Sequence, residues 1–401
     1  MNTAAIGKAT ATTPSREELM QRAERMLPTL RERATACEDA RTIPAETIAD
    51  FEAAGVYRIV QPRIYGGYEM CPTVLYDLAM IVASACPSSG WCLSLISVHN
   101  WTLALMDPRA AAEVWGRDST HRLSSSYAPF GRAEPVEGGF RVAGRWPWSS
   151  GCDHCQWVSV GGLIPGVDGA PPEMRFFLMP RADYEIDDTW FVSGLQGTGS
   201  KDIVVRGTFV PEYRTHKVAD SYRQQDIGLA TFTAPIYRYP MGVVFTFALT
   251  SPLLGMARGA LETYRAQMVS KVGVFDGASA LADPHNRQRV ADADAAIRGS
   301  ELRLKEVFRG LREHIDRGEP VPLASRVSGK WDAQVIAKAS VESVTHLFKA
   351  AGASAIRSSN PMQRYFRDAH AASNHAFLNT DKGSFNSGGV LLGAENLDFI
   401  V

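Results

Sequence analysis

The 401-residue sequence lacks an excess of charge of either sign, because 42 lysines and arginines nearly balance 43 aspartates and glutamates. Without a basic surface field, no general attraction to nucleic acid or to an anionic membrane is expected. Cysteine is also scarce, and its scatter favours free thiols over a disulfide framework. The six cysteines are Cys37, Cys71, Cys86, Cys92, Cys152 and Cys155.

Targeting and membrane-spanning signals are missing as well. The start, MNTAAIGKATATTPS, has no apolar core of the kind found in secretory signals. The longest apolar stretch, VVFTFALTSPLLGMA from Val243, is interrupted by Thr, Ser and Pro and is shorter than the roughly 20 residues that cross a bilayer. We therefore expect a cytoplasmic protein with no membrane partner.

A metal site is not expected either. Cys152 and Cys155 have the CxxC spacing, with His154 between them, but no second pair of ligands follows elsewhere in the chain. A structural zinc site normally needs such a second pair. Small residues packed behind a binding surface are the preferred interpretation.

The order of residue patterns is helical, then β, then helical, which predicts an α+β fold that is mainly α. Short β-rich runs separated by Gly, Pro and Asp are typical of a small antiparallel barrel or sandwich, and long amphipathic runs with short connections predict a four-helix bundle. The expected domains are an N-terminal helical domain at 1–117, a central β-barrel at 118–222 and a C-terminal bundle with a tail at 223–401. Helices are expected at about 16–54, in two pieces within 73–115, and at 249–271, 284–317, 324–351 and 361–376. The Gly- and Ser-rich segment 379–401 is expected to pack as a tail or to reach a neighbouring subunit.

The most informative stretch is WPWSSGCDHCQW, residues 146–157, which places two tryptophans, two serines and a glycine where a strand turns into a loop. Trp148 can lie against a planar ring by offset stacking. Ser149 or Ser150, next to the small Gly151, can point a hydroxyl at a ring heteroatom. This combination predicts a binding surface for a flat aromatic cofactor such as a flavin.

Over residues 16 to 393 the chain resembles the acyl-CoA dehydrogenase superfamily, in the form of two-component (group D), reduced-flavin-dependent aromatic monooxygenases. The motifs SSSYAPFGRAE and WPWSSGCDHCQWVSVGG look particularly like oxygenase components that hydroxylate the phenolic ring of a seco-steroid. After His375 the chain is more like relatives that act on polyketide, indole or other fused aromatics, so the substrate stays open. The other motifs of the resemblance are RTIPAETIADFEAAGVYRIVQPRIYGGYE, SVHNWTLALMD, VSGLQGTGSKDIVVRGTFVP and RYFRDAHAASNHAFLN.

The resemblance implies an oxygenase component that binds reduced flavin, FMNH2 or FADH2, supplied by a separate NAD(P)H-dependent flavin reductase. Oxygen would be captured as the flavin C4a-hydroperoxide and transferred to a phenolic or fused aromatic substrate. The family assembly is a homotetramer. Three alternatives stay open: an acyl-CoA dehydrogenase with bound FAD, a monooxygenase acting on sulfur or nitrogen of a heteroaromatic, and a catalytically silent flavin-binding protein.

Three residues are expected to be catalytic. Superfamily dehydrogenases often place a glutamate base soon after an RDA-type helix start, but no carboxylate follows Arg367-Asp368-Ala369 here. His375 instead matches a histidine that faces the flavin in the monooxygenases. Ser150 matches the hydroxyl that bonds flavin N5 and protects the hydroperoxide, with Ser149 as its alternative.

His99 lies on an otherwise apolar predicted helix. In phenol-hydroxylating relatives a histidine from this helix contacts the substrate hydroxyl. A phenol with a pKa near 10 is only about 0.1% ionised at pH 7, so a positioned base would assist its reaction. A buried histidine with a purely structural role is the alternative.

The residues expected to hold the cofactor come from separate segments. FKAAGASA resembles the stretch that contributes to the cofactor phosphate region of a neighbouring subunit. GLQGTGS at 194–200 has the glycines of a dinucleotide loop, but it leads into the predicted strand DIVVRGTFVP rather than a helix, so it is interpreted as barrel structure. The cofactor-binding candidates are Ser125, Ser126, Tyr127, Trp148, Ser150 and Gly352.

Overall fold

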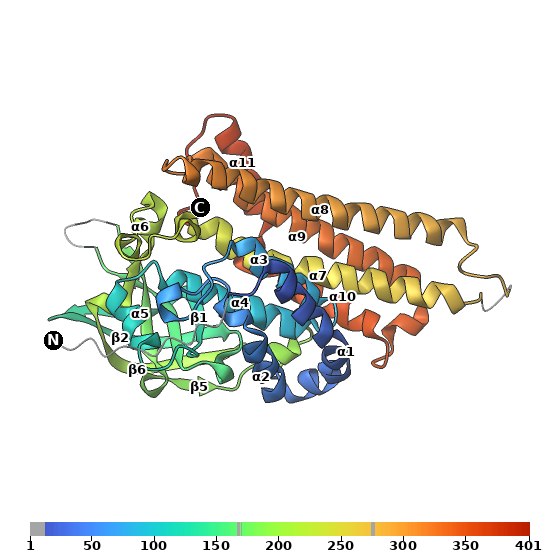
Figure 1. The fold of residues 1–401 in the computed structure, drawn as a ribbon, viewed down its shortest axis with the longest axis horizontal. Helices are drawn as coiled ribbons and strands as arrows, with labels where there is room; N and C mark the ends of the chain where they lie inside the picture. Colours follow the sequence, from blue (N-terminus) through green and yellow to red (C-terminus); the bar gives the residue numbers. More distant parts are fainter. Residues whose placement is uncertain (1–12, 167–168, 170, 274–276) are drawn as a thin grey trace.

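The computed structural model describes residues 13–166, 169, 171–273 and 277–401. The segment 1–12, which contains most of the start inspected for a secretory signal, lies outside the described residues. Within these residues, N-terminal helices come first, a β-sheet follows, and long helices come last (Figure 1). The predicted α+β, mainly α organisation is confirmed.

Four of the five N-terminal helices begin at or directly after a proline. Helix α2 starts directly after Pro44 and ends at Gly55, whose φ of 77° is the left-handed conformation that glycine adopts without strain. The region 73–115 forms three helices rather than the two expected, because Asp107 caps a further helix that starts at Pro108. The helices are α1 (Arg16–Ala40), α2 (Ala45–Ala54), α3 (Pro72–Ala83), α4 (Pro87–Leu103) and α5 (Pro108–Trp115).

The central region forms a seven-stranded sheet in the order β5-β6-β2-β1-β3-β4-β7. The expectation of purely antiparallel pairing was wrong for one pair, since β1 and β3 run parallel. Strand β2 returns antiparallel beside β1, and β3 then reverses again on the other side of β1. The strands are β1 (Leu123–Val136), β2 (Gly139–Ser149), β3 (Trp157–Ile164), β4 (Glu173–Pro180), β5 (Glu185–Asp187), β6 (Lys201–Pro211) and β7 (Thr215–Lys217).

The C-terminal helices lie side by side in the bundle at the upper right of Figure 1. The tail packs on the bundle, as one of the two expectations for it had it: Asn379 caps a helix, α11, which packs on α9. Gly383 permits that packing, because a Cβ there would lie 1.7 Å from the side-chain oxygen of Gln334. The helices after the sheet are α6 (Val218–Arg223), α7 (Met241–Ser270), α8 (Pro284–Asp316), α9 (Leu323–Ala351), α10 (Pro361–Ser373) and α11 (Thr380–Leu391).

Helix α7 is longer than the sequence pattern predicts, because it starts at Met241 and continues through Pro252. Among the described residues it is the one helix long and apolar enough to cross a membrane. Within its apolar window, however, 94% is buried inside the protein. Helix α7 is therefore a core helix.

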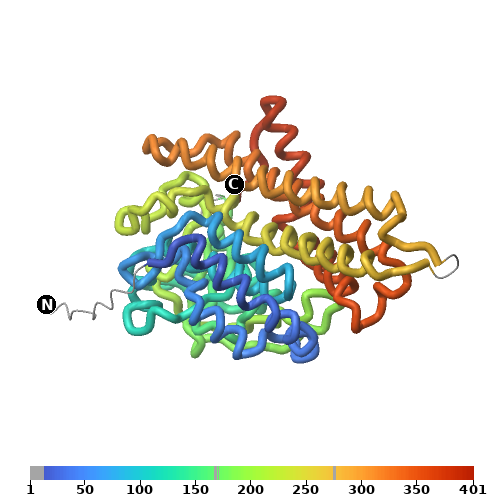
Figure 2. The backbone as a smooth tube through the Cα atoms, turned by 45° about the vertical axis from the view of Figure 1, so that its right-hand side comes forward, coloured from blue at the N-terminus to red at the C-terminus, as the bar shows by residue number. Residues whose placement is uncertain are grey.

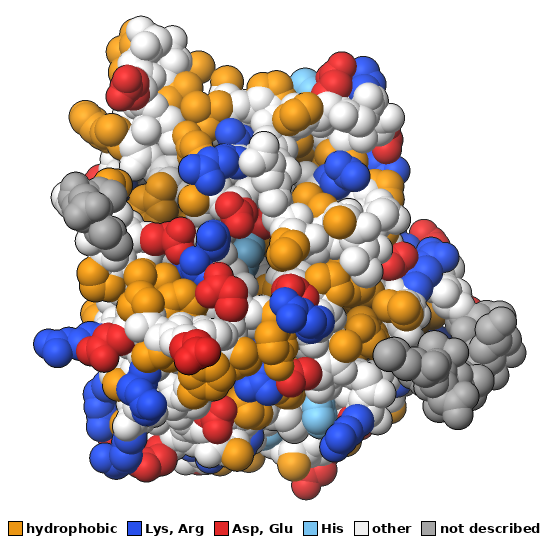
Figure 3. Space-filling view, turned by 90° about the vertical axis from the view of Figure 1, so that its left-hand side faces the viewer, with side chains coloured by type: hydrophobic (Ala, Val, Ile, Leu, Met, Phe, Trp, Pro, Cys, Tyr) orange, Lys and Arg blue, Asp and Glu red, His pale blue; other side chains and the backbone are white. Residues whose placement is uncertain are grey.

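The face of the molecule shown in Figure 3 mixes acidic, basic and apolar side chains, with no large area of one charge sign.

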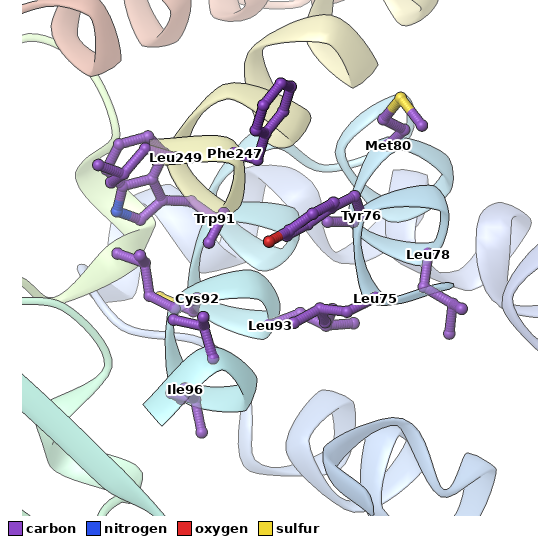
Figure 4. Close-up of a cluster of buried hydrophobic side chains, with 14 of the residues drawn as sticks. Leu75, Tyr76, Leu78, Met80, Trp91, Cys92, Leu93, Ile96, Phe247 and Leu249 are labelled. Carbon is purple, nitrogen blue, oxygen red and sulfur yellow. The ribbon is translucent and has the colours of Figure 1, made fainter. Parts of the chain in front are cut away.

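Two clusters of buried hydrophobic side chains support the fold of the described residues. The larger joins the N-terminal helices to α7, α8, α9 and α10, and the smaller lies within the sheet. Figure 2 shows the N-terminal helices in blue against the yellow start of the bundle. Every residue of α4 is buried, so this helix carries its polar side chains into the interior. Figure 4 shows Trp91 of α4 at the edge of a cluster that also contains Leu249 of α7.

Candidate active site

The two adjacent serines at the end of β2 point in different directions. A β-bulge between Trp146 and Ser149 shifts the register of β2 against β6 at this place, and bulges of this kind re-aim side chains. Ser149 is fully buried and donates to Ser124 Oγ at 3.0 Å, within the sheet. Ser150 Oγ accepts a 3.1 Å hydrogen bond from Trp91 Nε1. The geometry separates a structural serine from one that faces helix α4.

A row of hydroxyls continues from Ser150 into the loop that precedes β6. Ser150 Oγ lies 2.7 Å from Ser200 Oγ, and Ser200 Oγ lies 2.7 Å from Thr198 Oγ1. The loop 194–200 contains a three-residue 3-10 helix and leads, as predicted, into a strand, β6, and not into the helix that a dinucleotide loop would open. Sequence reasoning missed the two hydroxyls that this loop brings to Ser150.

His375 lies just after α10, with its ring centroid 6.4 Å from that of the Trp91 indole. Its Nδ1 accepts the backbone N–H of Phe377 at 3.2 Å. Burial and the nearby charge of Lys330 lower the pKa of His375 to about 4. The imidazole is therefore neutral near pH 7, and its proton is on Nε2 because Nδ1 is an acceptor.

Lys330 of α9 connects this region to the C-terminal residues. Its Nζ lies 4.8 Å from the centre of the Phe377 ring, at cation–π distance. The same ammonium donates to Asp398 Oδ2 at 2.5 Å and to the carbonyl of Ile400 at 2.7 Å. Lys330 is thus a buried, fully partnered cation beside His375, which sequence reasoning also missed.

His99 lies on helix α4, eight residues after Trp91. The ring is 3% exposed, and burial lowers its pKa to about 3, so it is neutral near pH 7. Its Nδ1 lies 3.3 Å from the hydroxyl of Tyr127, and its ring centroid lies 5.5 Å from that of Phe245. Because Trp91 and His99 are eight residues apart on one helix, they stand about 12 Å apart along its axis.

The three candidates around 125–127 lie in strand β1, not in a loop or a simple turn. Ser126 donates to the carbonyl of Pro147 at 2.7 Å and so fixes the strand that carries Trp148. Tyr127 stacks on Phe176 at 3.9 Å between centroids, and burial raises its pKa to about 12. The Tyr127 side chain therefore contacts Phe176 through its ring and His99 through its hydroxyl. Ser125 pairs with Ser159 of β3.

Trp148 presents its side chain to solvent, with 60% exposed. It meets Phe130 edge to face at 5.9 Å between centroids. Its backbone φ is 70°, which is a rare conformation for a bulky residue and is often associated with function. The structure thus holds an exposed aromatic pair two residues from Ser150.

Gly352 lies away from the other candidates, at the end of α9. It is 22 residues from Lys330 on this helix, which corresponds to about 33 Å along the axis. Lys271 donates to the neighbouring carbonyl of Ala351 at 2.5 Å, so a cation stands beside this glycine. The structure does not bring Gly352 together with Ser150 and His375 within one chain.

The remaining motif residues support the fold. Asp368 of the RDA stretch accepts the backbone N–H of Leu195 at 2.6 Å, and burial raises its pKa to about 7. The thiols of Cys152 and Cys155 donate to backbone carbonyls. In the described part of the chain, no group of three or more His, Cys, Asp or Glu side chains is arranged to hold a metal.

The site fits a flavin on two observations. Ser150 is only 9% exposed, yet its oxygen keeps acceptor capacity after its bonds with Trp91 and Ser200. The exposed pair of Trp148 and Phe130 offers aromatic surface at the end of the same strand. A planar ring bordered by one polar edge atom matches this arrangement.

Comparison with known proteins assigns the chain to a family. Residues 247–380 match the family "Acyl-CoA dehydrogenase, C-terminal domain". The chain is 40% identical over 361 residues to the flavin-dependent monooxygenase, oxygenase subunit HsaA, of Rhodococcus jostii, covering 89% of this chain and 94% of that protein. It belongs to the oxygenase components of two-component flavin-dependent monooxygenases.

Further similarities agree with this assignment. The oxygenase component of the FADH2-dependent resorcinol hydroxylase of a Rhizobium species is 31% identical, with 91% of each chain covered. The crystal structure of the HsaA monooxygenase from M. tuberculosis superposes with a TM-score of 0.91 at 36% identity, over 97% of this chain and 100% of that one. The acyl-CoA dehydrogenase fold and the monooxygenase prediction are confirmed, with reduced flavin as cofactor. An oxygenase component implies a separate reductase component.

Proposed function

We propose that this oxygenase hydroxylates a phenolic or fused aromatic substrate bound beside His99. The observation that carries the proposal is the buried, neutral His99 imidazole, hydrogen-bonded to Tyr127 about two helical turns from the Trp91–Ser150 pair. An aromatic environment surrounds this ring, with Tyr127 and Phe245 both near it. The name of the related resorcinol hydroxylase, which states a phenolic substrate, supports the same substrate class.

His99 would accept the hydrogen bond of the substrate hydroxyl. Ionising a phenol at pH 7 costs roughly 4 kcal/mol, because its pKa is about 10. The lowered pKa keeps the imidazole neutral, so a ring nitrogen is available as an acceptor. Tyr127 orients the ring through its contact with Nδ1, so the other ring nitrogen can accept the substrate O–H. This hydrogen bond polarises the O–H bond and raises the electron density of the substrate ring that is attacked.

The remaining candidates take roles around the cofactor. When bound, reduced flavin supplies the reaction with oxygen. Ser150 would accept the hydrogen on flavin N5, and His375, whose ring lies beside that of Trp91, would orient the reacting oxygen. Trp148 would cover the flavin ring. Ser125 and Ser126 would support its edge from β1.

A product assay tests the proposal. The purified protein is mixed with reduced flavin, oxygen and matched phenols, indoles, anilines and thioethers, and products are identified by mass spectrometry. Hydroxylation of a phenol or indole carbon, lost selectively in His99→Ala, is expected. Oxidation of sulfur or nitrogen alone, equal in parent and variant, would overturn the assignment.

The proposal also covers the oligomeric state, the reductase partner and the cellular location of the protein. Several large apolar side chains of the tail are exposed, which favours contact with another copy of the chain. Gly352 and the adjacent Lys271 would then serve the cofactor phosphates of a neighbouring subunit in a homotetramer. The reductase partner would use NAD(P)H, and the six free thiols favour the cytoplasm. The exposed tail side chains are Phe385, Leu391, Leu392, Leu397 and Phe399.

A further inference from the structure

The proton on each hydroxyl of the row from Ser150 to Thr198 can be assigned from its contacts. Thr198 Oγ1 lies 2.8 Å from the carbonyl oxygen of Leu195. Two oxygens approach this closely only with a hydrogen between them, and a carbonyl has none to give. Thr198 must therefore donate its single hydroxyl hydrogen to Leu195.

The remaining directions follow in sequence. Since the Thr198 hydrogen is committed, the 2.7 Å contact between Thr198 and Ser200 requires Ser200 to donate. The Ser200 hydrogen is then committed as well, and the 2.7 Å contact between Ser200 and Ser150 requires Ser150 to donate. Trp91 Nε1 is a donor only, and it uses one lone pair of Ser150. Ser150 is left with one free lone pair and no free hydrogen.

We infer that Thr198 and Ser200 are positioning residues that make Ser150 a pure hydrogen-bond acceptor, and that this polarity selects reduced over oxidised flavin. The inference rests on the proposed contact between Ser150 and flavin N5. Reduced flavin carries a hydrogen on N5, which Ser150 can accept. In oxidised flavin N5 is itself an acceptor, so two lone pairs would face each other.

Burial fixes the direction in which the hydroxyls from Ser150 to Thr198 donate. Thr198 is fully buried, Ser200 is 3% exposed and Ser150 is 9% exposed. Reversing the row would leave the Leu195 carbonyl facing the Thr198 oxygen without a hydrogen, and an unsatisfied buried polar contact is costly. For a two-component oxygenase the consequence is useful, because oxidised flavin in the same solution would compete poorly with the reduced form for the site.

The test measures binding rather than turnover. Dissociation constants of oxidised FMN and FAD are measured by fluorescence, and those of the reduced flavins by anaerobic titration. In Thr198→Val the valine cannot accept, so Ser200 is free to donate to Ser150 and Ser150 to donate to oxidised N5. The preference for reduced flavin should fall by roughly fivefold, the equivalent of one net hydrogen bond. Ser200→Ala should act in the same direction.

Ser149→Ala is the matched control, because its hydroxyl bonds Ser124 inside the sheet. It should leave the preference for reduced flavin unchanged. An unchanged or increased preference in both Thr198→Val and Ser200→Ala would overturn the inference.

Ser150→Ala distinguishes failure of the inference from failure of the proposed contact between Ser150 and flavin N5. If it weakens binding of reduced flavin while the other two variants change nothing, only the inferred role of Thr198 and Ser200 is wrong. If it changes neither affinity, Ser150 does not contact N5 and the proposed role fails too.

Discussion

The indole N–H of Trp91 donates to Ser150 Oγ at 3.1 Å, across 59 positions of sequence. This bond joins the fully buried helix α4 to the end of β2, and the same indole lies beside the ring of His375. Three segments from the helical, β and bundle regions therefore meet at one aromatic side chain. Substitutions at this meeting point should alter the handling of oxygen more than the fold.

Replacing Ser150 with alanine should increase peroxide release at the expense of hydroxylated product. The change removes the proposed N5 partner, and one hydrogen bond of about 1 to 3 kcal/mol corresponds to roughly 5- to 150-fold in the decay of the oxygen-reactive state. Stopped-flow absorbance with peroxide and product quantification measures this. Ser149→Ala is the control. If Ser150→Ala keeps the parent's coupling, that is, its ratio of hydroxylated product to released peroxide, Ser150 takes no part in the oxygen chemistry.

Replacing Trp91 with phenylalanine should loosen Ser150 and reduce coupling. The variant keeps the aromatic packing but loses the indole donor. Trp101→Phe is a matched control on the same helix, because its Nε1 donates to the Ile236 carbonyl instead. Both variants should lose roughly 1 kcal/mol of stability, measured by urea unfolding, but only Trp91→Phe should change the ratio of product to peroxide. Equal coupling losses in both would indicate a general packing defect.

Replacing His99 with alanine should slow oxygen transfer while the near-ultraviolet transient formed from reduced flavin and oxygen still appears at a near-normal rate. The defect should shrink as the pH rises toward the pKa of the phenol, near 10, because hydroxide then performs the ionisation. Double-mixing stopped-flow absorbance separates the two phases. His375→Ala should instead impair the transient even without substrate. Identical defects in the two variants would return His99 to a structural role.

Replacing Lys330 with methionine should raise the pKa of His375. The ammonium disfavours a second positive charge beside it, so its removal stabilises the imidazolium form and moves the pKa from about 4 toward the ordinary 6.5. Histidine-labelled NMR titration would report the shift. Lys338→Met, at an exposed position on the same helix, is the control. No shift in Lys330→Met would show that burial alone sets the value.

Acidification should destabilise the protein below about pH 6.5. His99 and His375 have folded-state pKa values of about 3 and 4. Between these values and the unfolded-state pKa near 6.5, the unfolded chain binds more protons, so stability falls as pH falls, by about 1.4 kcal/mol per pH unit for each histidine. Urea unfolding at several pH values tests this. His99→Gln should roughly halve the combined contribution of the two histidines to the slope of the unfolding free energy against pH. An unchanged slope would contradict the pKa assigned to His99.

The helical, β and helical order was predictable because local patterns determine it. Pro44 and Gly55 mark the ends of α2 through their own backbone preferences, and the long amphipathic runs gave α8 and α9 to within one or two residues. The tail was the exception. Its helix was not predicted, and α11 forms because packing on α9 outweighs the weak helix propensity of a Gly- and Ser-rich segment.

The residue types along the chain were enough to predict a hydroxyl, an aromatic surface and two histidines for flavin chemistry. Which serine faces the site depends on contacts between distant segments, since the bulge in β2 turns Ser149 into the sheet and Ser150 toward Trp91. The hydroxyls of Thr198 and Ser200 and the cation of Lys330 also come from distant segments. Hydrogen-bond direction and burial depend on these long-range contacts, which no local pattern specifies.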